Sequence, residues 1–273
     1  MAFHPPDPFA ISFAPVTARN RLRCMLRWRD RSAMGEARRR KQAAGNPKAE
    51  QAPPAKLPAA LLQSITSQVE GFIAKDLGCD TREKATALAA RQPVKVAQYV
   101  DSLIDSWFDP RMPIQGAPAA CRAGCSWCCW MIPGLRSGEA DLLLTAIAQL
   151  PEAEGAEIKA KVKVAATAIV DAGSSEAAYP LRCPLLGDDG RCRVYTARPA
   201  VCRAFAATDA TACERLYRGG DEKSEIPMTM RSACAQVAYV AVTNTFGDNR
   251  VKATPLPVAL ARALELGSKR PDS

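Results

Sequence analysis

Nine of the eleven cysteines in this 273-residue chain lie between residues 121 and 234, and eight of these nine form two groups. The first group, within "CRAGCSWCCW" (121–130), has the spacing C-x3-C-x2-C-C. The second group follows at intervals of 9, 10 and 11 residues. A chain of this length can bury a hydrophobic core without crosslinks, so the pattern points to chemistry at the thiols. The eight residues are Cys121, Cys125, Cys128, Cys129, Cys183, Cys192, Cys202 and Cys213.

The chain has a single histidine, His4, near its N-terminus. A catalytic Cys–His pair and histidine-containing zinc sites are therefore excluded from the remainder of the chain. All-thiolate sites favour zinc or iron–sulfur over magnesium, calcium or manganese. Because the side chains of adjacent residues diverge, Cys128 and Cys129 are expected to serve two ions or two corners of a larger cluster. These features favour an iron–sulfur cluster and leave one to two zinc ions as the alternative.

The N-terminal segment lacks the order of a secretory signal peptide, because its arginines follow a short, proline-broken apolar stretch. No segment reaches the roughly 18 unbroken apolar residues of a membrane helix. We therefore expect a cytoplasmic protein with reduced thiols, in which clustered cysteines bind metal more often than they form disulfides. A redox pair drawn from these cysteines stays open, although no thioredoxin-like context surrounds them.

The basic character of the chain is confined to its beginning. Residues 1–60 hold 12 Lys and Arg against 4 Asp and Glu, and the rest hold 25 against 24, so the net charges are +8 and +1. The core thus offers no electrostatic case for nucleic acid, and no membrane partner is expected. Residues 1–57 are predicted to be a disordered basic leader, with Met34 as an alternative start and an Arg-rich presequence as the other interpretation.

Apolar residues recur at helical spacing through most of the remaining chain. We expect helices at 61–73, 81–91 and 93–107, a helix capped by Ser137, and others at 151–173, 208–218, 228–246 and 257–266. A hairpin is expected in 182–206, with its turn at Asp188–Gly190. The predicted fold is mainly α: a single irregular helical domain around a cysteine-rich centre. Its parts are a helical segment 58–110, a metal-chelating domain 118–215 and C-terminal helices 216–273.

Several other residues could support a thiolate centre. Four thiolates on a divalent ion leave a net charge of −2, which neighbouring cations can compensate. Trp127 and Trp130 could exclude water or simply pack in the core. The acids at 139–141 could add an oxygen ligand or stabilise a helix N-terminus. Cys24 and Cys79 are expected to be unligated. The arginines near the second group are Arg182, Arg191, Arg193, Arg198 and Arg203, of which Arg198 and Arg203 are the candidates to stand behind the ligands.

The two groups together resemble a bacterial family of cysteine-cluster proteins named for a CxxCxxCC motif and described as zinc- or iron-chelating domains. Its second motif is similar to "CPLLGDDGRCRVYTARPAVCRAF" (183–205). The first pair here is C-x3-C rather than C-x2-C, and Leu185 and Val194 replace the usual Phe and Ile. The resemblance covers about residues 118–215 and implies metal chelation.

The resemblance leaves the activity open. One member, the flagellin lysine methylase, is associated with a [4Fe–4S] cluster and S-adenosylmethionine, but the present chain has no Gly-rich nucleotide motif. The first hypothesis is a cysteine-ligated metal-binding protein whose activity, enzymatic or not, is unknown. The second is a cluster-containing, protein-modifying enzyme similar to that methylase. The third is a metal-stapled interaction module that presents helices 58–108 and 228–246 to a protein partner.

Overall fold

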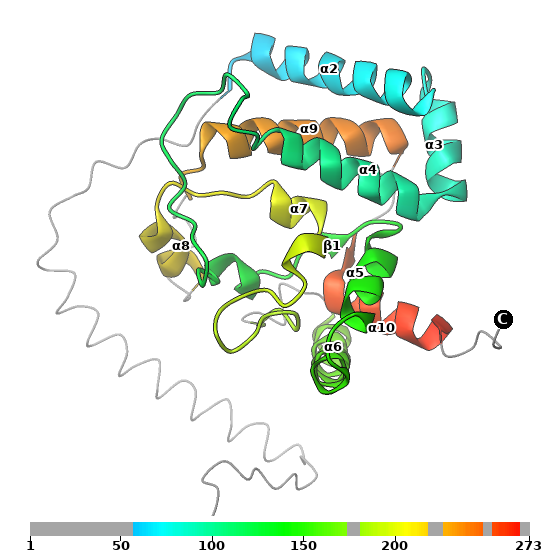
Figure 1. Ribbon diagram of the computed structural model, residues 1–273, viewed down its shortest axis with the longest axis vertical. Coiled ribbons are helices and arrows are strands. Elements are labelled where there is room, and N and C mark those ends of the chain that lie inside the picture. The colour runs from blue at the N-terminus through cyan, green and yellow to red at the C-terminus, as the bar shows by residue number, and fades with distance from the viewer. Residues whose placement is uncertain (1–56, 174–180, 218–225, 248–252, 268–273) are drawn as a thin grey trace, which may run out of the picture. The chain divides into compact units, whose positions relative to one another are not determined.

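The computed structural model of the chain describes residues 57–173, 181–217, 226–247 and 253–267 (Figure 1). Residues Ala52–Ser273 form one compact unit. The mainly helical fold predicted from the sequence is confirmed, with one small two-stranded sheet within these ranges. The predictions of a disordered leader and of a start at Met34 concern residues that lie outside the described ranges.

The first three helices in the described part of the chain begin and end where local signals place them. They are α2 (Ala59–Leu77), α3 (Arg82–Arg91) and α4 (Pro93–Ser106). The side chain of Thr81 caps α3 by accepting a hydrogen bond from the Lys84 N–H at 3.3 Å. Pro93 occupies the first turn of α4, where its missing N–H is not needed. The predicted helices of this segment are therefore confirmed.

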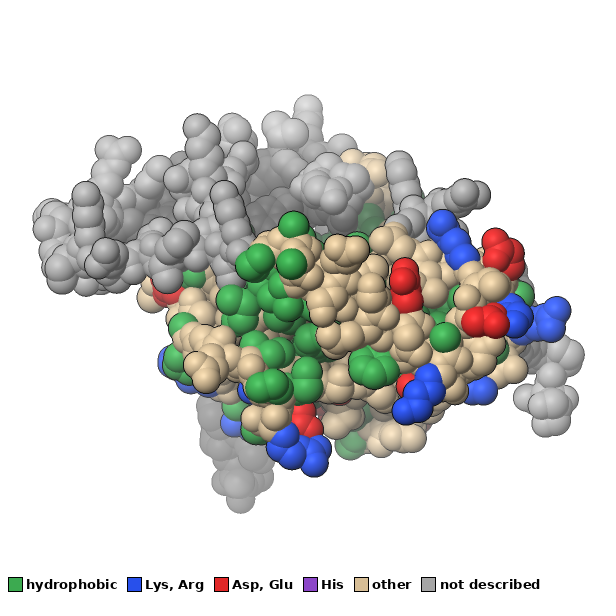
Figure 2. Space-filling view, turned by 90° about the horizontal axis from the view of Figure 1, so that it is seen from above, with side chains coloured by type: hydrophobic (Ala, Val, Ile, Leu, Met, Phe, Trp, Pro, Cys, Tyr) green, Lys and Arg blue, Asp and Glu red, His purple; other side chains and the backbone are tan. Residues whose placement is uncertain are grey.

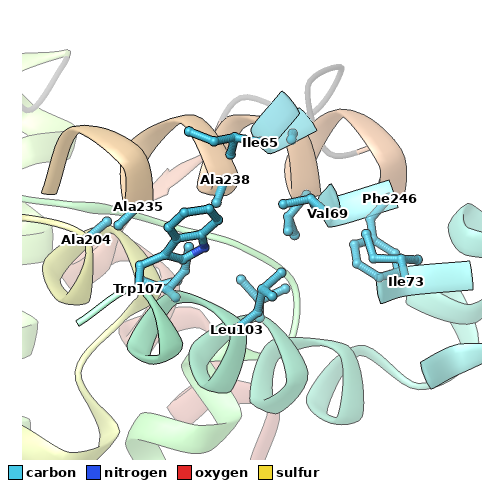
Figure 3. Close-up of a cluster of buried hydrophobic side chains, with 14 of the residues drawn as sticks. Ile65, Val69, Ile73, Leu103, Trp107, Ala204, Ala235, Ala238 and Phe246 are labelled. Atoms are coloured by element: carbon cyan, nitrogen blue, oxygen red, sulfur yellow. The ribbon is translucent and has the colours of Figure 1, made fainter. Parts of the chain in front are cut away.

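These three helices pack around α9 (Met230–Phe246), which is buried on several sides. Alanines of α9 allow close approach, and Figure 3 shows the indole of Trp107 facing Ala235 and Ala238. At the other end of α9, Phe246 lies beside Ile73 of α2 (Figure 3). Truncating a buried Phe of this kind typically costs about 3–5 kcal/mol. The segments 58–108 and 228–246 thus bury their apolar faces against each other.

A second apolar core joins α5 (Glu139–Ala148), α6 (Glu152–Ala172) and α10 (Leu256–Gly267). A short antiparallel pair, β1 (Gly134–Leu135) with β2 (Thr254–Pro255), ties the start of this core to α10. The sequence did not predict this pairing. The expectation that Ser137 caps α5 is wrong, because the cap position belongs to Gly138 at φ +84°. A side chain at Gly138 would collide with the Pro93 backbone.

The cysteine-bearing segments lie between the two cores (Figure 1). They contain the 3-10 turns η1 (Trp127–Trp130) and η2 (Tyr195–Ala197), and the short helices α7 (Ala200–Arg203) and α8 (Ala210–Tyr217). The predicted hairpin is reduced to one antiparallel bridge between Leu186 and Cys192. Irregular backbone of this kind lets one short stretch present several side chains to a common centre.

None of the described helices is both long and apolar enough to cross a membrane. Figure 2 shows the face seen from the α2 side, where hydrophobic side chains gather among polar ones. Large apolar side chains of α2 remain exposed at Leu61, Leu62 and Phe72. Scattered exposure of this size is ordinary for a folded domain.

Candidate metal centre

All ten cysteines in the described ranges are free thiols. Cys121 and Cys128 are exposed, Cys213 is buried, and the other five of the eight candidates are half-buried. The structure therefore joins none of these ten cysteines in a disulfide, and their thiols are available as soft metal ligands.

The backbone brings the two sequence groups together. The Cys183 N–H donates a hydrogen bond to the Cys129 carbonyl at 2.8 Å. Nearby, Gly124 and Gly190 both have positive φ, at +86° and +75°. A Cβ at Gly190 would lie 2.8 Å from the Gly124 carbonyl oxygen, so the two loops meet where only glycine fits. The expectation that the second group folds back on the first is confirmed.

One neighbourhood of thiols contains Cys121, Cys125 and Cys213. The Ala207 N–H donates to Cys121 Sγ at 3.4 Å, which fixes Cys121 beside the segment that precedes α8. Burial is the main cause that raises the pKa of Cys213 to about 12, and the charges of Cys121, Cys128 and Cys125 contribute to the same shift. Each thiol of this set therefore lies within electrostatic reach of the others.

The two tryptophans of η1 cover this neighbourhood. Both are partly buried and pack against a small cluster that contains Ala207 and Cys213. Their indoles therefore contribute apolar packing and at the same time shield the Cys213 thiol from water. The two roles considered for Trp127 and Trp130 do not exclude each other.

A second neighbourhood contains Cys129, Cys183, Cys192 and Cys202. Burial is the main cause that raises the pKa of Cys183 to about 12, and the charges of Cys192 and Cys128 contribute to the same shift. Burial also raises the pKa of Cys202, followed by the charges of Cys183, Cys128 and Cys192. Cys183 and Cys192 pack against the α5–α6–α10 core. Buried thiols that lie near one another stay protonated unless a metal cation displaces their protons.

Cys128 stands at the junction of the two neighbourhoods. Its thiol and that of Cys129 share a hydrogen bond, which lowers the pKa of Cys128 to about 7 and raises that of Cys129. Both residues belong to the 3-10 turn η1.

Arg198 and Arg203, the two arginine candidates, contact different parts of the fold. The Arg198 guanidinium lies over the Tyr195 ring at 4.1 Å. Its charge contributes to the lowered pKa of Cys128, and it opposes the burial that raises the pKa of Cys192. Its Nε is buried and has no hydrogen-bond partner among the described residues. Arg198 is thus placed to favour thiolates.

Arg203 instead ties α7 to α4. Its Nη1 donates to Asp105 Oδ2 at 2.5 Å, and its Nε lies 3.3 Å from Asp101 Oδ1. Further donors reach the carbonyls of Arg198, at 2.8 Å, and Thr196. These contacts hold the backbone of the Cys202 turn against the neighbouring helix.

Two of the other arginines of the second group form ion pairs with acids. Arg182 pairs with Asp188 at 3.1 Å. Arg193 pairs with Glu154 at 3.0 Å and with Asp189 at 3.5 Å. Of these two, Arg182 also acts on a candidate ligand, because its charge opposes the burial that raises the pKa of Cys183.

Two buried polar residues, Glu139 and Ser232, hold the backbone around the site. Glu139 accepts hydrogen bonds from the Arg136 N–H at 2.8 Å and from the Ala200 N–H at 2.9 Å. It therefore serves helix N-termini, the simpler of its two predicted roles, and one of these starts the helix that carries Cys202. Ser232 of α9 accepts from the Ala206 N–H at 3.0 Å and donates to the Ala204 carbonyl at 2.7 Å.

The candidate thiols do not surround a common metal position in this structure. In the part of the chain that the structure describes, no group of three or more Cys, His, Asp or Glu side chains has the spacing to hold a metal ion. The donors are nevertheless of one chemical kind, reduced and gathered in two adjacent neighbourhoods. This donor set fits zinc or iron–sulfur chemistry, and rotation of the side chains would have to complete it.

Comparison with known proteins gives one matching family model. No curated protein and no solved structure matches the chain significantly. The matched segment includes both cysteine groups and the first turns of α9. Residues 120–235 match the model of the CxxCxxCC family, described as "Putative zinc- or iron-chelating domain", and the matched segment holds all eight candidate thiols.

Proposed function

We propose that this protein binds metal through the thiolates of Cys121, Cys125, Cys128, Cys129, Cys183, Cys192, Cys202 and Cys213, holding zinc or an iron–sulfur cluster. The observation that carries the proposal is the meeting of two distant cysteine segments, joined by the Cys183–Cys129 backbone hydrogen bond and containing only free thiols. The family match supports zinc or iron chelation in general.

The bound metal would supply the energy that closes the site. A structural zinc ion contributes roughly 10–16 kcal/mol of apparent binding free energy, enough to remove the protons of buried thiols and to reorient their side chains. The protein's own part is to exclude water with Trp127 and Trp130, and to offset negative charge with Arg198. Glu139 and Ser232 hold the backbone around Cys202.

Reduced thiols favour one cellular compartment for this protein. Eight free cysteines persist where thiols are kept reduced, and the cytoplasm is the usual compartment of that kind. We therefore keep the cytoplasm as the proposed location.

The choice between zinc and iron–sulfur is open to a direct experiment. Protein purified without oxygen is analysed for metal and for absorption near about 400 nm, where a cluster absorbs and zinc does not. Cys202→Ser and Cys125→Ser should lower the metal content, while Cys79→Ser, a buried cysteine of the α2–α9 core, should leave it unchanged. A wild-type protein without bound metal would refute the proposal.

One observation favours an enzyme as the second candidate. An open surface hollow of about 370 Å³ reaches Arg203, the residue after Cys202, and its other polar lining residues include Gln98, Asp105 and Thr145. A small polar substrate or S-adenosylmethionine would need such a space close to the metal. Calorimetry with S-adenosylmethionine tests this candidate, and the absence of binding dismisses the methyl-transfer version of it.

The packing of the helices leaves less apolar surface for the third hypothesis, a metal-stapled interaction module. The helices proposed as partner surfaces pack on each other through residues such as Val69, Trp107 and Ala238. A partner would have to use the apolar side chains that α2 leaves exposed.

A further inference from the structure

The surface hollow that reaches the α7 helix is lined mainly by α4 and α5, and η2 contributes the rest of its lining. Its volume of about 370 Å³ lies in the range of sites that hold small molecules. Polar side chains of Gln98, Thr145 and Gln149 share this lining with the apolar side chains of Leu142 and Ala146. A ligand that matches this α4–α5 hollow therefore combines polar groups with a short apolar part.

The carboxyl group of Asp101 borders the α4–α5 hollow and is poorly solvated. The residue is only 9 % exposed, and its Oδ1 accepts no hydrogen bond from any residue that the structure describes. A buried carboxylate oxygen normally has a donor, because the free energy of its lost hydration is otherwise not recovered. Asp101 is thus a buried acid at the wall of a hollow that is open to ligands.

The nearest cation, Arg203, is largely committed to other partners. Its Nε donates to the Arg198 carbonyl at 2.8 Å, its Nη1 donates to Asp105 Oδ2 at 2.5 Å, and its Nη2 donates to the Thr196 carbonyl. Asp101 Oδ1 lies 3.3 Å from Arg203 Nε as an ion pair, but it receives none of these hydrogen bonds. One guanidinium is therefore shared by two carboxylates.

The charges around Asp101 leave one negative charge in excess. The charged groups that act on it are Arg203, Glu139, Asp105 and Arg198. With Asp101 ionised, three carboxylates stand against two guanidiniums, which gives a net charge of −1. A cation held at the wall of the α4–α5 hollow would balance this charge.

We infer that the α4–α5 hollow binds a small organic cation, an alkylammonium ligand whose charge faces Asp101 and whose carbon chain lies along Leu142 and Ala146. This function goes beyond metal binding and does not depend on it. A metal ion fits the hollow less well, because no three Cys, His, Asp or Glu side chains in the described ranges are spaced to hold one. An ammonium group needs only one charged partner, and its carbon chain adds apolar contact.

Calorimetric titration of the full chain, purified without oxygen, with butylamine tests this inference. The titration is done in phosphate buffer at a pH of about 8, because Asp101 has a raised pKa of about 7 and alkylammonium groups lose their proton only near about 10. Butanol has the same carbon chain without the charge. We expect butylamine to bind at least about tenfold more tightly than butanol, since a charged partner is lost with the amine.

Two sets of variants locate the binding site. Asp101→Asn should weaken butylamine binding at least about tenfold, and circular dichroism checks that it folds. Gln98 is an exposed residue of the lining, so Gln98→Lys should weaken binding and Gln98→Glu should strengthen it, each by about two- to fivefold. Gln63→Lys, at an exposed position of α2, adds the same charge outside the hollow and should leave the affinity unchanged.

Several results would overturn the inference. They are the absence of butylamine binding to the wild type, equal affinities for butylamine and butanol, and equal affinities of the two Gln98 variants. A folded Asp101→Asn protein with wild-type affinity would also overturn it. Metal content is measured on the same samples, so the loss of this inference leaves the proposed metal binding to its own test.

Discussion

Glu139 Oε1 accepts a hydrogen bond from the Ala200 N–H at 2.9 Å, so a buried carboxylate of α5 holds the start of the helix that carries Cys202. Its second oxygen accepts from the Arg136 N–H at 2.8 Å. One side chain thereby links the end of β1, the first turn of α5 and the cysteine-bearing turn.

Glu139→Ala should therefore lower both stability and metal retention. It leaves two backbone N–H groups without an acceptor, at a typical cost of about 1–3 kcal/mol each. The free energy of unfolding in urea and the metal content after dialysis against a chelator measure the two effects. Glu152→Ala, an exposed acid in the first turn of α6, is the matched control and should change little. Equal behaviour of the two variants would show that the Ala200 contact is unimportant.

Gly190→Ala should disrupt the contact between the two cysteine loops. The residue has φ +75°, and a Cβ there would lie 2.8 Å from the Gly124 carbonyl oxygen. Gly173→Ala is the control, because Gly173 has a similar φ of +82° but nothing within 4 Å of the added atom. Both variants pay about 1–2 kcal/mol for the left-handed backbone. Only Gly190→Ala should lose more than this and also lose metal, and a Gly190→Ala protein with wild-type metal content would contradict the loop contact.

Arg203→Ala should destabilise the fold strongly. Its side chain is 10 % exposed and pairs with Asp101 and Asp105, so truncation leaves a buried carboxylate without its cation. The expected loss is on the order of 3 kcal/mol in the free energy of unfolding. Arg111→Ala removes an ion pair in which the arginine is 90 % exposed, and should cost about 0–1 kcal/mol. Comparable losses in the two variants would disprove the special role of Arg203.

Asp101 should make stability depend on pH. Burial raises the pKa of this carboxyl to about 7, against the opposing effect of Arg203. The folded chain therefore binds the proton more tightly than the unfolded chain, so this residue lowers stability as the pH rises from about 4 to about 7. Asp101→Asn cannot ionise, and the difference in unfolding free energy between variant and wild type should grow in favour of the variant across that range. A difference that stays constant with pH would show that Asp101 does not titrate there.

The sequence predicted what depends on local signals. The helical period, Thr81 before α3, Pro93 at the start of α4 and Gly173 after α6 each act within a few residues, and the structure agrees.

The sequence could not predict what depends on distant partners. The pairing of Gly134 with Pro255 joins two-residue strands that carry no strand pattern of their own. Arg203 looked like a cation for the thiolates, and its choice of Asp101 and Asp105 follows from how α7 meets α4.

X-ray absorption at the metal edge of anaerobically purified wild-type protein tests the central claim most directly. The account predicts a bound zinc or iron centre whose nearest atoms are sulfur alone, at about 2.3 Å for zinc. A nearest-atom shell of nitrogen or oxygen, or a protein that carries no metal at the edge, would contradict it.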